Sequence, residues 1–146
     1  MNISEQLFEN GYAIKEVLLL DGKIAAVLRN LSAKDQLSLE RYMSAVEGST
    51  AFILHTYSVR LLSRTLIEYN EKKIPSQEKA LSVIDTLPGA VVDYLVKAQH
   101  SFEKETAKVF TGEDIKDTFF ETASTDSDSK QPLDQEILEK EEVSAS

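Results

Sequence analysis

Two runs of strand-forming residues on either side of Asp21-Gly22 constrain this chain more than any other feature of its sequence. The first run covers residues 13–20 and the second covers residues 23–30. An Asp-Gly pair suits a tight hairpin turn, because both central positions of such a turn need positive φ. The sequence therefore predicts an N-terminal β-hairpin. A lone hairpin is only marginally stable in water, so we expect it to pack on helices or on a partner.

Amphipathic patterns after residue 30 predict a mainly helical remainder. Apolar residues recur at helical spacing between residues 33 and 110, and serines that can cap helices precede three of these segments. Pro75 and Pro88 separate the later segments, and Gly48 is expected to end the first one. The expected helices cover residues 33–47, 50–69, 76–86 and 89–110, with a short helix after Thr111-Gly112 and a helical turn in 1–12 with Leu7 and Phe8 on its apolar side.

These elements predict an α+β fold that is mainly α, with the hairpin packed on four to five helices. The hairpin and helices form one domain at residues 13–121, and residues 1–12 form an N-terminal extension. Residues 122–146 are rich in Ser, Thr, Asp and Glu, and this composition predicts a disordered acidic tail.

The charge of the chain is concentrated near its C-terminus. The chain has 25 acidic and 16 basic residues, a formal net charge of −9. Residues 113–146 contain eleven of the acidic residues and only three lysines, which leaves residues 1–112 almost neutral. Nucleic-acid binding depends on clustered Lys and Arg, so we expect no nucleic-acid partner.

Composition also narrows the cellular setting. There is no Cys, which excludes disulfides, thiolate nucleophiles and cysteine-based zinc sites. No apolar run reaches the roughly 18 to 20 residues that a membrane-spanning helix needs, and the N-terminus lacks the pattern of a secretory signal. We expect a soluble intracellular protein that contacts no membrane.

The sequence predicts no catalytic, cofactor or metal site. His55 and His100 lie on different expected helices, and the acidic Glu103 beside His100 does not make a ligand set by itself. Glu103 and Glu105 are expected on an exposed helix face, where nothing would shift their pKa values for acid–base chemistry. The five glycines fall at turns or helix ends rather than in a phosphate-binding motif.

Tyr57, Arg60, Leu61 and Arg64 are the candidate partner-binding residues. They lie on one expected helix, where the two arginines flank an apolar stripe at i, i+4 spacing. One interpretation is an exposed recognition face, on which the guanidinium groups bind an acidic segment of a partner. The other is that the arginines form salt bridges with Glu68 or with a neighbouring helix.

Three stretches, in this order and spacing, resemble the tail assembly chaperones of tailed bacteriophages. The first is the hairpin of residues 15–29, which leads into Leu-Ser-Ala-Lys-Asp-Gln-Leu at 31–37. The second is residues 57–67, followed by a polar loop that ends in Ile74-Pro75. The third is Leu-Pro-Gly-Ala-Val-Val-Asp-Tyr-Leu at 87–95, followed by a Glu-containing helix. The resemblance covers roughly residues 13–110, and the acidic tail has no counterpart in it.

The resemblance implies a non-enzymatic protein of the host cytoplasm that holds the tape measure protein, or another tail protein, during virion assembly. It implies no catalytic residue and no cofactor. The alternative is a baseplate, hub or other minor tail subunit that stays in the virion tail. Under either function, the exposed edge of the hairpin can pair with a second copy of the chain, so a homo-oligomer is an open expectation.

Overall fold

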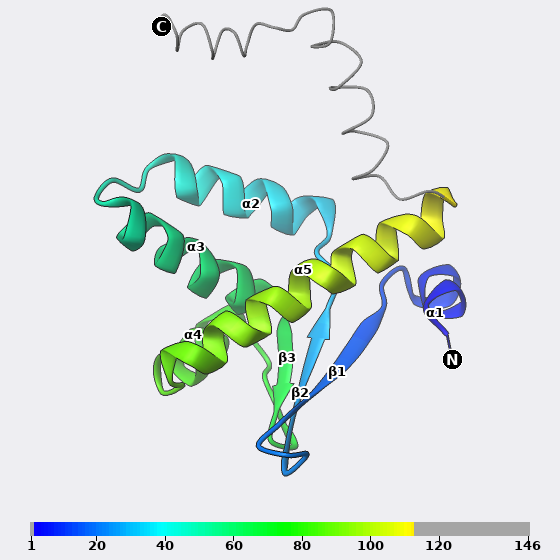
Figure 1. Ribbon diagram of the computed structural model, residues 1–146. Helices are drawn as coiled ribbons and strands as arrows, with labels where there is room; N and C mark the ends of the chain where they lie inside the picture. Colours follow the sequence, from blue (N-terminus) through cyan, green and yellow to red (C-terminus); the bar gives the residue numbers. More distant parts are fainter. Residues whose placement is uncertain (1, 113–146) are drawn as a thin grey trace, which may run out of the picture. The chain divides into compact units, whose positions relative to one another are not determined.

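The computed structural model describes residues 2–112 (Figure 1). Residues 2–106 form the first of two compact units, and the described residues 107–112 belong to the second. A four-stranded antiparallel sheet with strand order β1-β2-β3-β4 and five helices make up the described residues. The fold is therefore α+β and mainly α, as predicted. Within these residues, no helix combines the length and the apolar character needed to cross a membrane.

The predicted hairpin is confirmed as strands β1 (Ile14–Leu19) and β2 (Ile24–Arg29). Their register runs from Ile14 opposite Arg29 to Leu19 opposite Ile24. The turn between them has four residues rather than the expected two, because Leu20 also takes a positive φ of 52° beside Asp21 and Gly22. The amides of Gly22 and Lys23 donate to the carbonyls of Leu19 and Leu20 and close this turn.

The hairpin is not alone, because two further strands follow helix α3 directly. Strand β3 (Leu66–Tyr69) pairs with β2, and the short β4 (Lys72–Lys73) pairs with β3. The expected continuation of a helix to residue 69 is therefore wrong. Leu66 leaves the helical conformation with φ −82° and ψ 112°, and its buried side chain lies opposite buried Leu28 of β2.

Serine caps start three of the helices at the predicted positions. The hydroxyls of Ser32, Ser49 and Ser76 each accept a hydrogen bond from the amide three residues ahead. The capped helices are α2 (Ala33–Ser44), α3 (Thr50–Thr65) and α4 (Gln77–Asp85), and the long α5 (Gly89–Thr111) follows Pro88. Helix α2 ends earlier than expected, at Ala45, so Gly48 lies in the loop before α3 instead of closing α2.

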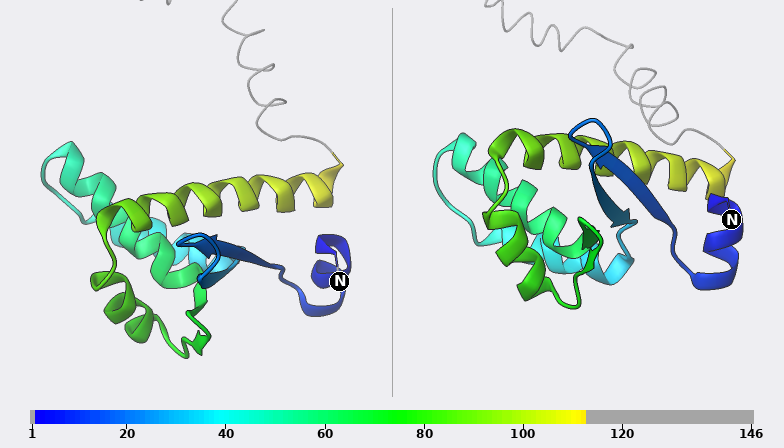
Figure 2. Two further views of the ribbon diagram at one scale, coloured as in Figure 1. Left: turned by 60° about the horizontal axis from the view of Figure 1, so that its bottom comes forward. Right: turned by 90° about the horizontal axis from the view of Figure 1, so that it is seen from below.

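The main core fills the space between the sheet and helices α2 to α5. Leu28, Leu61, Leu62 and Leu95 are at its centre and almost fully buried. Figure 2 shows α5 running across one side of the sheet, with α3 and α4 together beside it.

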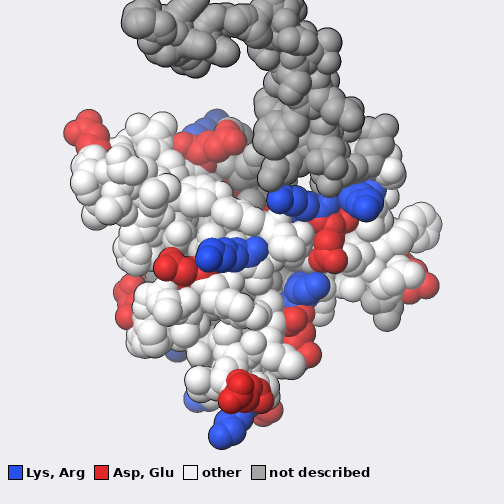
Figure 3. Space-filling model, viewed as in Figure 1, with Lys and Arg blue, Asp and Glu red and all other residues white. Residues whose placement is uncertain are grey.

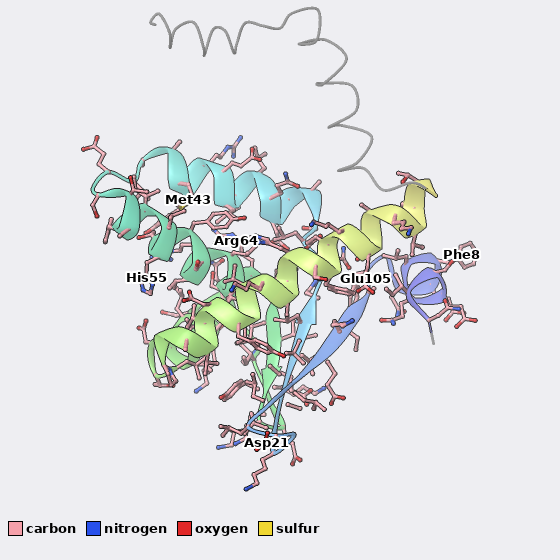
Figure 4. The ribbon with its side chains drawn as sticks, in the orientation of Figure 1. Phe8, Asp21, Met43, His55, Arg64 and Glu105 are labelled. Atoms are coloured by element: carbon pink, nitrogen blue, oxygen red, sulfur yellow. The ribbon has the colours of Figure 1, made fainter. Side chains whose placement is uncertain are left out.

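A second, smaller cluster holds the N-terminal helix. Helix α1 (Ile3–Asn10) begins with a capping box at Asn2 and ends at Gly11. Its Leu7 is buried with Ala13 and Phe102. Phe8, expected on the same apolar side, is instead 91% exposed and points away from the helix in Figure 4. The expected helix after Thr111-Gly112 and the predicted disordered tail at 122–146 lie outside the described residues.

Candidate functional site

An apolar groove with a volume of about 620 Å³ is formed by α2, α3 and α5. Figure 3 shows mostly uncharged side chains on the surface between α2 and α5. We call this hollow the helix groove. It is lined by Leu31, Gln36, Leu39, Glu40, Met43, Ile53, Leu54, Tyr57, Leu61, His100 and Glu103.

The helix groove remains open to solvent although its floor belongs to the core. Leu39 and Leu61 are buried, whereas Leu54 is 61% exposed. Met43 and Ile53 are half-buried between these extremes. The first two turns of α3 therefore present apolar side chains that no described element covers. A contiguous exposed apolar patch of this kind is typical of a surface that binds another protein.

Glu103 of α5 forms a polar edge of the helix groove. Its Oε2 accepts hydrogen bonds from the Leu31 amide and from Gln99 Nε2, each at 2.6 Å. Gln99 Nε2 also donates to the Arg29 carbonyl at 3.0 Å and is fully buried. Burial raises the pKa of Glu103, and the two hydrogen bonds and nearby His100 oppose this rise. The expectation that Glu103 lies on an exposed face is therefore wrong.

Tyr57 and His100 meet at the same edge. The Tyr57 hydroxyl lies 3.4 Å from His100 Nε2, and the two ring centroids are 6.1 Å apart. Burial, and to a smaller extent the charge of Glu103, raise the pKa of Tyr57. The raised pKa keeps the Tyr57 hydroxyl protonated. The pair therefore offers hydrogen-bonding groups at the edge of the groove, and Tyr57 is not activated as a base.

The four predicted binding residues lie in different surroundings in the structure. Tyr57 lines the helix groove, as a binding residue should. Leu61, however, is only 1% exposed. The expectation that Leu61 is part of an exposed recognition face is therefore wrong, because the sheet and the neighbouring helices cover its side chain.

The two arginines join α3 to α2 and do not line the helix groove. The Arg60 guanidinium lies 4.2 Å from the ring centroid of Tyr42. Arg64 donates to the Arg60 carbonyl and to Ser38 Oγ at 2.8 and 2.9 Å, and Figure 4 shows it between α2 and α3. Burial first, and then Arg60, lower the pKa of Arg64. The alternative prediction, that these arginines form salt bridges, is also wrong for the described residues. Glu68 forms its salt bridge with Lys73 instead.

A second apolar hollow lies between the tip of the β1–β2 hairpin and the start of α5, and it is smaller. Its volume is about 380 Å³, and no charged side chain lines it. Leu20 and Tyr94, both more than half exposed, are part of its lining. Its polar side-chain groups are the hydroxyls of Tyr69 and Tyr94, and the rest of its lining offers apolar contact.

Sequence reasoning missed the contributions of α2 and α5 to the helix groove. Glu103 is expected on an exposed face, and helical spacing predicts only that Leu39 and Met43 lie on the apolar side of their helix. The spacing of apolar residues does not show which of them border an open groove. The sequence does contain one indication of this site, which is the presence of Gln99, His100 and Glu103 on an otherwise apolar helix. Polar residues on a buried face usually have defined hydrogen-bond partners.

The described residues contain no group of three or more His, Asp or Glu side chains that could hold a metal ion. His55 is exposed on α3, away from the helix groove. Comparisons with protein families, curated proteins and solved structures found no match to this chain.

Proposed function

We propose that this protein is a tail assembly chaperone of a tailed bacteriophage, which binds a helical segment of the tape measure protein, or of another tail component, in the helix groove. The observation that carries the proposal is Leu54, which is 61% exposed next to the fully formed core of α3. The resemblance of residues 13–110 to that family supports the phage setting. On this proposal the protein works in the host cytoplasm.

The physical reason for such binding is the exposed apolar surface of the client. A long helical protein exposes apolar seams until its assembly partners cover them, and such seams associate with one another. An amphipathic helix can place one apolar stripe in a groove between helices, with anchors at i, i+3, i+4 and i+7. The helix groove provides such a surface through Met43, Ile53, Leu54 and Tyr57.

Substitution of Leu54 tests this binding mode without disturbing the core. Leu54→Asp should reduce co-purification of the tape measure protein about tenfold or more, because it places a charge in an apolar contact. Leu20→Asp is the matched control: Leu20 is 67% exposed and lies outside the helix groove. Equal recovery of the client by both folded variants would contradict the proposed site.

Quantitative mass spectrometry of purified particles and of the infected-cell lysate distinguishes a chaperone from a virion subunit. A chaperone is abundant in the lysate and absent from finished particles. A fixed copy number in the particle would instead identify a baseplate, hub or minor tail subunit and would overturn the chaperone function.

A further inference from the structure

We infer that the helix groove selects a helix that carries Lys or Arg beside its apolar stripe. This inference rests on the proposed function, because it specifies the chemistry of the client segment that the groove would take.

The charges of the lining residues have one sign. Glu40 from α2 and Glu103 from α5 are the charged residues of the lining, which contains no Lys or Arg. The salt bridges found within residues 2–112 join Lys15 to Glu105 and Lys73 to Glu68. Neither groove carboxylate is therefore paired with a cation in the described part of the chain.

The two carboxylates come from the two helices that border α3. Helix α3 lies between α2 and α5 in Figure 1, and it provides the apolar floor through Ile53, Leu54, Tyr57 and Leu61. Glu40 lines the groove from α2, and Glu103 lines it where α5 meets the start of α2, since it accepts from the Leu31 amide. Cationic side chains beside the apolar stripe of a bound helix are thus favoured, and acidic ones face like charges.

Glu103 has the capacity to accept such a cation. Both of its hydrogen bonds end on Oε2, and no donor among the described residues reaches Oε1. The carboxylate is partly buried, so water stabilises it less than at a free surface, and a charge-assisted hydrogen bond is stronger there. Among the described residues, the Glu40 carboxylate on α2 accepts only a 3.4 Å contact from Gln36 Nε2.

Two synthetic helices test this inference against the full-length chain. Both have about 20 residues, roughly 30 Å of helix, and the same apolar stripe, with Lys on both flanks in one peptide and Glu in the other. Fluorescence anisotropy gives their dissociation constants. Because the whole chain is acidic, the Glu40→Gln/Glu103→Gln variant is compared with Glu9→Gln/Glu16→Gln, which removes the same charge from exposed positions outside the groove.

We expect the Lys peptide to bind the unaltered protein more tightly than the Glu peptide. The Glu40→Gln/Glu103→Gln variant should weaken its binding roughly threefold to tenfold, in line with two partly exposed ion pairs. Glu9→Gln/Glu16→Gln should leave most of the affinity in place. Gln at position 103 keeps an acceptor oxygen for the Leu31 amide, so the fold is retained.

The inference is overturned if neither peptide binds, if both bind equally, or if the two double variants weaken binding alike. Failure of the inference and failure of the proposed function remain separable. Loss of the natural client in Leu54→Asp, together with equal binding of the two peptides, rejects the charge preference and keeps the proposed site. Retention of the client in Leu54→Asp rejects the proposed site itself.

Discussion

Glu103 joins three parts of the fold through one carboxylate oxygen. It accepts from the amide of Leu31, which links β2 to α2, and from Gln99 on its own helix. Gln99 in turn binds the carbonyl of Arg29 at the end of β2. The side chain therefore fixes the entry to α2 relative to α5 and lines the helix groove at the same time.

This position gives Glu103 a measurable effect on pH-dependent stability. In the folded protein its pKa lies above the ordinary value of 4.5, chiefly because of burial. The folded state therefore binds the proton more readily than the unfolded chain. The resulting stabilisation is fully present below 4.5 and is lost as the pH rises through the raised pKa.

Urea unfolding of the wild type and Glu103→Gln at several pH values between 4.5 and neutrality tests this effect. The free energy of unfolding of the wild type should rise relative to that of the variant as the pH falls. Glu9→Gln, at an exposed position on α1, should follow the wild-type curve. Parallel curves for wild type and Glu103→Gln would show that Glu103 titrates as it does in the unfolded chain.

The candidate site was only partly predictable at this scale. Tyr57 lines the helix groove, and its role in binding a partner stays a prediction, whereas Leu61 and the arginines do not form an exposed face. Helical spacing identifies the apolar side of a helix, but it does not separate residues covered by a neighbour from residues left open. Leu54 and Leu61 lie seven residues apart on one helix, and only the position of the sheet and of α5 makes one exposed and the other buried.

Among the elements, strand β3 shows why a helical pattern can extend too far. Leu66 and Ile67 continue the i, i+3/i+4 apolar stripe of α3, and no Gly or Pro separates them from it. Periodicity alone therefore assigned residues 66–69 to the helix. Pairing with β2 overrides this local preference, since Leu66 and Tyr69 lie opposite Leu28 and Ala26. The hairpin, the capping serines and the long last helix were predictable because their signals are local.

The β3–β4 turn carries a backbone strain that can be removed. Asn70 and Glu71 both have positive φ, at 52° and 66°, and this two-residue turn favours Asn followed by Gly. Asn tolerates the left-handed region, whereas Glu does so at a cost. Glu71→Gly should therefore raise the free energy of unfolding by about 1 kcal/mol.

Chemical denaturation measures this gain, and Glu71→Ala provides the control. Alanine removes the same charge but keeps the unfavourable φ, so it should not stabilise the protein. If both substitutions change stability equally, the charge of Glu71 is responsible and its backbone conformation is not.

The first compact unit as a whole has two apolar clusters of unequal size. The main cluster contains thirteen buried residues, whereas the cluster that holds α1 contains three. Leu7 is the one residue of α1 that is buried. Partly buried Ile3 packs on the same cluster, and Gln6 accepts from the Ile14 amide, but Leu7 provides the buried contact of α1 with Phe102 and Ala13.

Leu7→Ala should release α1 without unfolding the main core. A substitution of this kind removes about 2–3 kcal/mol of packing, and hydrogen exchange should become faster for the amides of α1 while those of α3 and β2 keep their protection. Phe8→Ala, at a 91% exposed position on the same helix, should leave all rates unchanged. Loss of protection throughout the unit after Leu7→Ala would mean that the two clusters unfold together.

Helix α2 has one buried residue, Leu39, and otherwise meets α3 through the Arg60–Tyr42 and Arg64–Ser38 contacts. Met43 of the same helix is partly buried against the core and lines the helix groove, and its side chain adapts easily to the shape of its neighbours. We expect this side of the groove to discriminate between bound helices by their diameter and charge more than by the identity of each residue. If the proposed function holds, one such protein binds many non-identical stretches of the same long client, and the length of client that is covered then increases with the number of copies of the protein.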